Sequence, residues 1–162
     1  MDLKYGIIGC GMMGQEHLRN IALLERASVA AIFEPDAAMR AKASELAPGA
    51  AMVASLAEVV AHPDVNVLLI VSPNYLHLEQ LEEIAASRPL PILCEKPLFT
   101  DPADAPRLAA LRNAYPAPIW VAMEYRYMPP VAHLIQQAQD VTGGVKMLTI
   151  REHRFPFLEK VG

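Results

Sequence analysis

A glycine-rich turn near the start of the chain restricts its fold more than any other stretch. Residues 6–14 read Gly-Ile-Ile-Gly-Cys-Gly-Met-Met-Gly, so an apolar, strand-like run enters Gly9, Gly11 and Gly14, and a helix-like segment leaves them. A second apolar run ends at Glu34, about 20 residues beyond the last glycine. This order of strand, glycine turn, helix, strand and carboxylate is typical of a unit that binds a dinucleotide.

Each glycine has a separate physical role in that interpretation. Gly9 permits a tight turn, Gly11 lets the backbone approach a pyrophosphate, and Gly14 lets helix and strand pack closely. The residues at the start of the helix, including Met12 and Met13, offer unpaired N–H groups and a positive dipole end to the same pyrophosphate. We therefore predict that the turn and the helix start bind a cofactor; the alternative is a glycine-rich turn without a ligand.

The carboxylate at the end of the second apolar run predicts which dinucleotide binds. Glu34 can accept hydrogen bonds from the adenosine ribose hydroxyls, and its charge repels a 2′-phosphate. Pro35 and Asp36 follow it, and the nearest arginine that could receive a phosphate is Arg40. The sequence therefore predicts NAD as the cofactor, with NADP less favoured.

Composition limits the classes of protein and partner. The chain has 162 residues, of which 53% are hydrophobic and 20% charged, as expected for a globular domain rather than a disordered chain. The net charge of −4 argues against nucleic acid or an anionic membrane as the main partner. Cys10 and Cys94 are too few for a disulfide framework or a metal site, and they predict a reducing compartment. We expect a cytoplasmic protein that binds no metal.

Apolar strands alternate with helical segments along most of the chain. The expected strands are Lys4–Gly9, Val29–Glu34, Ala51–Val53, Val67–Val71, Ile92–Cys94 and Ile119–Met123. The expected helices are Met13–Leu24, Pro35–Glu45, Leu56–Ala61, Leu76–Ser87, Pro102–Asn113 and Val131–Ala138. Such alternation predicts right-handed βαβ units and an α/β fold with a doubly wound parallel sheet.

The pattern changes after Pro129 and Pro130. A last helix leads to a Gly143–Gly144 turn and then to Val145–Phe155, where side chains alternate as in a long strand. No partner strand follows it in the sequence, and a solitary edge strand is unstable. We predict a dinucleotide-binding domain over residues 1–127, followed by a linker helix and the opening strand of a truncated α+β second domain over residues 128–162.

Polar residues follow two of the expected strands where ligands of open α/β sheets bind. Ser72, Pro73, Asn74 and His77 follow the fourth strand, so Asn74 and His77 could meet the cofactor. The alternative is that Asn74 caps the next helix and His77 lies on its surface.

Glu95, Lys96 and Pro97 follow the next strand. A lysine in this crevice could hydrogen-bond a substrate hydroxyl or share its proton, since lysines with a lowered pKa do acid–base work near neutral pH. The alternative is an ordinary Glu–Lys pair on the surface. Arg126, which follows the last strand, could reach the rim of the crevice or could belong to a linker.

Together these motifs resemble the glucose–fructose oxidoreductase / inositol dehydrogenase / rhizopine-catabolism (Gfo/Idh/MocA) family. The glycine turn, Glu34, Pro73-Asn74-x-x-His77, Glu95-Lys96-Pro97 and Tyr125-Arg126-Tyr127-x-Pro129 occur in the order and approximate spacing of that family. The resemblance covers the whole chain and implies a Rossmann domain of an NAD(P)-dependent enzyme acting on sugars, cyclitols or related hydroxy compounds.

The resemblance also implies roles for individual residues. Lys96 would bind the reacting hydroxyl as the catalytic residue, Glu95 would contact the nicotinamide side, and Asn74 and His77 would line the cofactor cleft. Only about 5–6% of X–Pro bonds in folded proteins are cis, but the resemblance implies a cis bond before Pro97.

One departure from the family concerns the second half of its members, which supplies the substrate pocket, the usual dimer surface and the general base. The resemblance therefore implies a homo-oligomer for a full-length form and no turnover by these 162 residues alone. Two functions stay open at this point. One is a dehydrogenase that takes a small polyhydroxy substrate; the other is a truncated NAD(P)-binding module, such as a sensor or subunit, without catalysis of its own.

Overall fold

The computed structural model describes residues 2–140, 143, 144, 147, 149 and 151. The chain divides into two compact units, Met1–Met123 and Glu124–Gly162. The first unit is built on a sheet of parallel strands. This is the doubly wound α/β architecture that the alternating pattern predicts, and it carries the sequence motifs from the glycine turn to Pro97.

Strands and helices alternate along the first unit. The strands are β1 (Leu3–Ile8), β2 (Ala27–Phe33), β3 (Ala51–Val53), β4 (Val67–Ile70), β5 (Ile92–Cys94) and β6 (Ile119–Val121). They lie in the sheet in the order β3-β2-β1-β4-β5-β6. The helices are α1 (Met12–Ile21), α2 (Ala37–Leu46), α3 (Leu56–Ala61), α4 (His77–Ala85) and α5 (Ala105–Ala114), with 3₁₀ turns η1 (Asn74–Leu76) and η2 (Pro102–Asp104). The second unit contains η3 (Glu124–Tyr127) and α6 (Pro129–Asp140).

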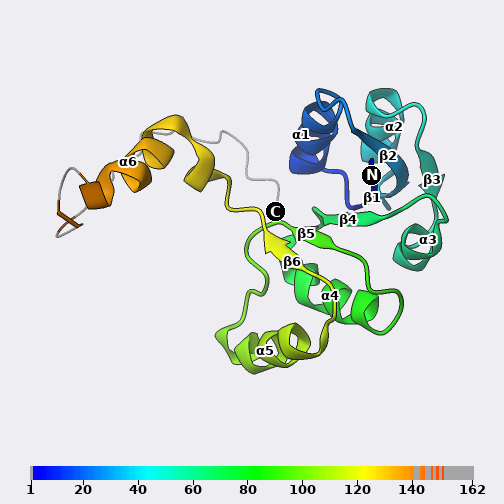
Figure 1. Cartoon of the computed structure of the whole chain (residues 1–162). Helices are drawn as coiled ribbons and strands as arrows, with labels where there is room; N and C mark the ends of the chain where they lie inside the picture. Colours follow the sequence, from blue (N-terminus) through cyan, green and yellow to red (C-terminus); the bar gives the residue numbers. More distant parts are fainter. Residues whose placement is uncertain (1, 141–142, 145–146, 148, 150, 152–162) are drawn as a thin grey trace. The chain divides into compact units, whose positions relative to one another are not determined.

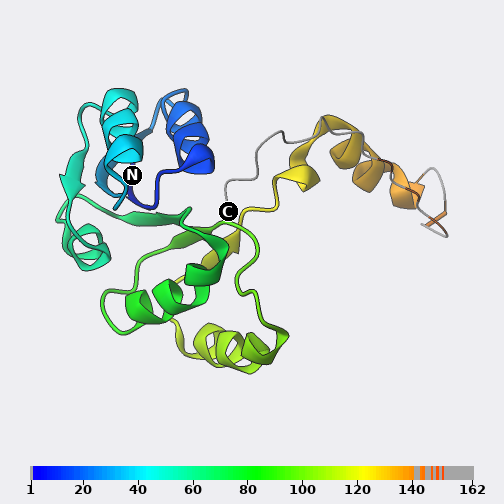
Figure 2. The ribbon, with the colours of Figure 1, turned by 180° about the vertical axis from the view of Figure 1, so that it is seen from behind.

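The central strand β4 and the second half of β1 are buried on both faces because helices cover each side of the sheet (Figures 1 and 2). On one face Ile7 and Leu69 pack with residues of α1 and α2. On the other face Ile8 and Leu68 pack with residues of α3, α4 and α5. Successive strand residues point to opposite faces, so continuous apolar runs supply two cores at once.

The helix ends differ from the expected ranges by up to three residues. The helix expected from Pro35 begins at Ala37 because Asp36 is its N-cap, and the Asp36 side chain accepts a hydrogen bond from the Met39 N–H at 2.8 Å. The helix expected from Pro102 begins instead with the 3₁₀ turn η2. Most of the strand predicted over Val145–Phe155 lies outside the described residues. Among the described residues no helix has the length and apolar character needed to span a membrane.

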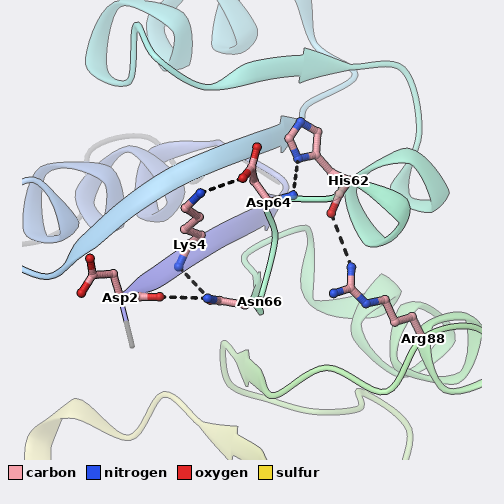
Figure 3. A network of polar contacts seen from close by, with 6 residues as sticks. All are labelled: Asp2, Lys4, His62, Asp64, Asn66 and Arg88. Carbon is pink, nitrogen blue, oxygen red and sulfur yellow. Dashed lines mark hydrogen bonds and ion pairs between the residues drawn. The ribbon is translucent and has the colours of Figure 1, made fainter.

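The amino ends of β1 and β4 are joined by an exposed polar network (Figure 3). Asn66 accepts a hydrogen bond from the Lys4 N–H and donates one to the Asp2 carbonyl, both at 2.8 Å. The Lys4 ammonium lies 2.7 Å from Asp64, and both side chains are about half exposed. This network fixes the register at the edge of the sheet opposite to the glycine turn.

Candidate functional site

Gly9 makes the turn after β1, and no other residue type fits there without strain. Its φ is +84°, a left-handed conformation that favours glycine. A Cβ on Gly9 would lie 2.6 Å from the backbone N and Cα of Ser72, which follows β4. The turn role that the sequence predicts for Gly9 is confirmed, and the close approach also ties the glycine turn to the end of a neighbouring strand.

The start of α1 is packed closely on one side and open on the other. A Cβ on Gly14 would lie 2.9 Å from the Gly9 carbonyl oxygen, so the predicted role of Gly14 in close packing is confirmed. A Cβ on Gly11, by contrast, would meet nothing within 4 Å. Among the described residues no side chain caps the helix, and no acidic residue lies in its first turn, while Met12 and Met13 are exposed. The first N–H groups of α1 are therefore free to receive an anion.

Glu34 follows β2 and is buried, with an exposed fraction of 8%. One carboxylate oxygen accepts a hydrogen bond from the Cys10 N–H within the glycine turn. The other accepts from the Asp36 N–H at 2.8 Å. The carboxylate thus lies against the glycine turn. This position is required of a residue that contacts the same ligand as the turn.

A cleft of about 530 Å³ adjoins this carboxylate, between the end of β2, the start of α2 and β3. Glu34, Pro35 and Arg40 belong to its lining. Nη1 of Arg40 donates to the carbonyl oxygens of Glu34 and Pro35, at 2.8 and 3.1 Å. The arginine nearest to Glu34 in the sequence is therefore also near it in space, but its Nη1 is already hydrogen-bonded to backbone carbonyl oxygens.

The two polar motif residues after β4, Asn74 and His77, differ in burial. Asn74 is exposed at the start of η1, and neither η1 nor α4 has a side-chain cap, so the alternative that Asn74 caps the helix is wrong. His77 is fully buried, so the alternative of a surface histidine is also wrong. Its ring nitrogens lie 2.7 Å from the Pro97 carbonyl oxygen and 2.9 Å from that of Ser72. His77 thus joins the loop after β4 to the loop after β5.

Glu95 is not the partner of a surface lysine. Its exposed fraction is 7%, and Oε1 lies 2.9 Å from Nε2 of His17 on α1. Burial alone raises the pKa of the Glu95 carboxyl, but the His17 hydrogen bond and charge, with the Lys96 N–H, hold that pKa below its usual range. The alternative of an ordinary Glu95–Lys96 surface pair is therefore wrong.

Lys96 is the exposed member of the same motif. The bond between Lys96 and Pro97 is cis, which confirms the expectation drawn from the family resemblance. No hydrogen bond or ion pair of Nζ is found among the described residues, while Glu95 and Pro97 on either side are held by histidines. The Lys96 ammonium is thus available to a ligand.

The two cysteines are buried beside acidic residues of the site. Burial, with a smaller effect of the Glu34 charge, raises the pKa of the Cys10 thiol to about 11. Burial and then the Glu95 charge raise the pKa of Cys94 to about 12. Both thiols are therefore protonated at neutral pH and act as small apolar residues. In the described part of the chain no group of three or more His, Cys, Asp or Glu side chains is arranged to hold a metal ion.

The predicted site residues of the first unit follow β1, β2, β4 and β5, which are neighbours in the sheet. Their loops lie at its carboxyl edge, where ligands of doubly wound sheets bind. Arg126 lies in η3 of the second unit, so its predicted place at the rim stays a prediction. Sequence reasoning missed His17: its only signal is its place one turn after Gly14, and its partner Glu95 lies 78 residues further on.

A family model matches this part of the chain. The model of the oxidoreductase family with an NAD-binding Rossmann fold, Gfo/Idh/MocA, matches residues 3–123. Inositol 2-dehydrogenase of Corynebacterium glutamicum (strain R) is 34% identical over 157 residues, which are 96% of this chain and 46% of that protein. Inositol 2-dehydrogenase of Renibacterium salmoninarum is 44% identical over 107 residues, which are 65% of this chain and 32% of that protein. The chain thus spans less than half the length of these relatives.

Solved structures show the same fold. The myo-inositol dehydrogenase of Lactobacillus casei, crystallised with NAD(H) and myo-inositol, has a TM-score of 0.77 and 25% identity, covering 85% of this chain and 41% of that one. The apo scyllo-inositol dehydrogenase of the same organism has a TM-score of 0.80 at 22% identity, covering 88% of this chain and 43% of that one. The second likeness concerns the fold alone.

Proposed function

The chain belongs to the Gfo/Idh/MocA oxidoreductase family with the NAD-binding Rossmann fold, and we propose that it is the cofactor-binding part of an NAD-dependent dehydrogenase. The reaction is hydride transfer between the nicotinamide and the carbinol carbon of a cyclitol, sugar or related polyhydroxy compound. One observation carries this proposal: the glycine turn, the Glu34 carboxylate and the exposed Lys96 follow β1, β2 and β5 and lie at the same carboxyl edge of the sheet.

The residues at this edge fit NAD. The open side of Gly11 and the uncapped start of α1 suit the pyrophosphate. Glu34, at the cleft beyond β2, suits the ribose hydroxyls of the adenosine half. Ser72, Pro73 and Asn74 follow the adjacent strand and line the path towards Lys96. NAD, when bound, supplies the acceptor or donor of the hydride.

Lys96 is the proposed catalytic residue of this chain. Its ammonium can donate a hydrogen bond to the oxygen of the reacting hydroxyl and can take part in moving the proton on that oxygen. The inositol dehydrogenases among the relatives act on a polyol, which supports a polyhydroxy substrate here. The family resemblance places the general base and the dimer surface in the second half of such enzymes, so a homo-oligomer belongs to the proposal for a full-length form.

We expect the 162-residue chain by itself to bind NAD without oxidising polyols. A positioned general base contributes about 10²–10⁴-fold in rate, and loss of substrate positioning removes further factors. The measurement is absorbance of reduced nicotinamide with a panel of inositols and sugars. Clear turnover by this chain would show that Lys96 or another described residue acts as the base. A cytoplasmic location, which the two free and buried cysteines favour, is part of the proposal.

Calorimetric titration of the chain with NAD and NADP tests the cofactor assignment. We expect NAD to bind more tightly, because the charge of Glu34 repels a 2′-phosphate and Nη1 of Arg40 already serves two backbone carbonyls. Glu34→Ala should weaken NAD by about tenfold or more, since hydrogen bonds to a charged group are lost, and should relax the preference. Asp64→Ala, at the opposite edge of the sheet, is the control and should change neither affinity. Equal or tighter binding of NADP by the unsubstituted chain would contradict the assignment.

A further inference from the structure

A histidine that no motif assigned connects the start of α1 with the Lys96 loop. His17 lies one helical turn after Gly14, on the helix whose first turn is the proposed pyrophosphate site. Its Nε2 lies 2.9 Å from Oε1 of Glu95, and the two side chains are 21% and 10% exposed. A carboxylate as buried as that of Glu95 requires hydrogen-bond donors, and the described residues that supply them are His17 and Lys96.

The second oxygen of the carboxylate continues the connection. Oε2 of Glu95 accepts a hydrogen bond from the backbone N–H of Lys96 at 3.2 Å. The carboxylate therefore stands between a helix side chain on one oxygen and the backbone of the exposed lysine on the other. A carboxylate held on both oxygens has a fixed plane, so its orientation sets that of the adjacent peptide.

We propose that His17 is a positioning residue that acts through Glu95: it fixes the carboxylate, and the carboxylate fixes the Lys96 backbone beside the nicotinamide end of the cofactor. This inference rests on the proposed function and extends it. In this proposal Glu95 connects His17 to the Lys96 backbone, in addition to contacting the nicotinamide. Because His17 and the pyrophosphate site share one short helix, the connection also transmits the position of the bound cofactor to the Lys96 loop.

Two nucleotides separate this role from a general structural one. NAD and ADP-ribose share the pyrophosphate and both riboses, but only NAD carries the nicotinamide. His17→Ala should weaken the binding of NAD by about three- to tenfold, the effect of one positioned hydrogen bond. The affinity for ADP-ribose should stay within about twofold of that of the unsubstituted chain. His17→Gln keeps an N–H donor at the place of Nε2 and should restore the affinity for NAD. His62→Ala, at the amino edge of the sheet, is the matched histidine control and should change neither.

Three results of these titrations would overturn the inference. NAD and ADP-ribose could weaken equally in His17→Ala, which would mean that His17 only supports the glycine turn. A second such result is that His17→Ala changes neither the affinity for NAD nor the affinity for ADP-ribose. The unsubstituted chain could bind the two nucleotides equally tightly, which would mean that no nicotinamide contact depends on the Lys96 loop.

Amide exchange in the chain without nucleotide tests the connection independently of cofactor binding. The Lys96 N–H should exchange about five- to tenfold faster in His17→Ala than in the unsubstituted chain and should recover in His17→Gln. The Ala122 N–H, bonded to the Cys94 carbonyl at 2.9 Å just beyond the end of β6, is the internal reference and should not change. An unchanged Lys96 rate overturns the inference. If the chain binds neither nucleotide, the proposed function fails and this exchange experiment alone decides the role of His17.

Discussion

The two edges of the parallel sheet hold their polar side chains in opposite ways. At the carboxyl edge lie Glu34, His77 and Glu95, which are the buried polar or charged side chains of the described residues. At the amino edge the pair of Lys4 and Asp64 is exposed to solvent. Burying a polar group costs free energy unless every partner is present, whereas an exposed pair costs and contributes little.

This difference shows where the chain carries functional constraint. Each buried polar group at the carboxyl edge joins two segments. Glu34 joins the end of β2 to the glycine turn, His77 joins the loops after β4 and β5, and Glu95 joins the loop after β5 to α1. Removing one leaves its partners unsatisfied in the interior. At the amino edge, water can replace any lost partner. We therefore expect substitutions to have large effects at the carboxyl edge and small effects at the amino edge.

Gly9→Ala should give the largest effect. The substitution places a Cβ 2.6 Å from the Ser72 backbone at a φ of +84°, so both the left-handed conformation and the close approach are penalised. We expect the free energy of unfolding to fall by about 3–5 kcal/mol, or the chain not to fold. Urea denaturation followed by circular dichroism measures it.

Gly49→Ala is the matched control for this glycine. A Cβ on Gly49 would meet nothing within 4 Å, and its φ is not in the left-handed range. We expect a change of no more than about 1 kcal/mol, in the stabilising direction. Equal losses for Gly9→Ala and Gly49→Ala would mean that the glycine turn adapts to a side chain and that the carboxyl edge is not rigid.

His77→Leu should give the next largest effect. Leucine fills the buried space but cannot hydrogen-bond the Ser72 and Pro97 carbonyl oxygens, so the direct link between the loops after β4 and β5 is lost. The expected loss of unfolding free energy is about 2–3 kcal/mol. At the amino edge, Nδ1 of His62 accepts a hydrogen bond from the Asp64 N–H at 3.3 Å (Figure 3). His62→Leu should lose less than about 1 kcal/mol, because water can take the place of this exposed bond. The contrast between edges would fail if the two histidine variants were equally stable.

Asp64→Asn should give the smallest effect. The Lys4 hydrogen bond and charge hold the pKa of the Asp64 carboxyl below its usual range, but both side chains are about half exposed. Because the folded-state pKa is lowered, the contribution is present above about pH 4 and is lost as the pH falls through that lowered pKa. At pH 7 we expect the Tm to change by no more than about 2 °C. A shift several times larger would show that the amino edge is as constrained as the carboxyl edge.

The fold follows from local patterns in the sequence. The continuous apolar run at Val67–Ile70 indicates a strand covered on both faces, and the structure places it beside β1 at the centre of the sheet. The left-handed turn at Gly9 and the close packing at Gly14 also follow from the glycine spacing. These features depend on a few consecutive residues, so one sequence is enough to predict them.

The site was harder to predict because its bonds join distant residues. Spacing indicates that Glu34 and Lys96 lie at the carboxyl edge, but it does not show that Glu95 is bonded to His17 on a helix or that His77 is buried between two carbonyl groups. Spacing also left open whether Asn74 caps a helix. Such choices depend on the packing of loops against one another, which periodicity does not encode.

The place of β1 in the sheet has a consequence for synthesis of the chain on the ribosome. β1 is made first, yet it is a central strand that pairs with β2 on one side and with β4, from Val67 onwards, on the other. Until Val67 has left the ribosome, Ile7 and Ile8 lack one neighbouring strand and expose an apolar edge. The nascent chain therefore needs protection longest at the segment that is made first, and the complete carboxyl edge exists only after Lys96 has been added.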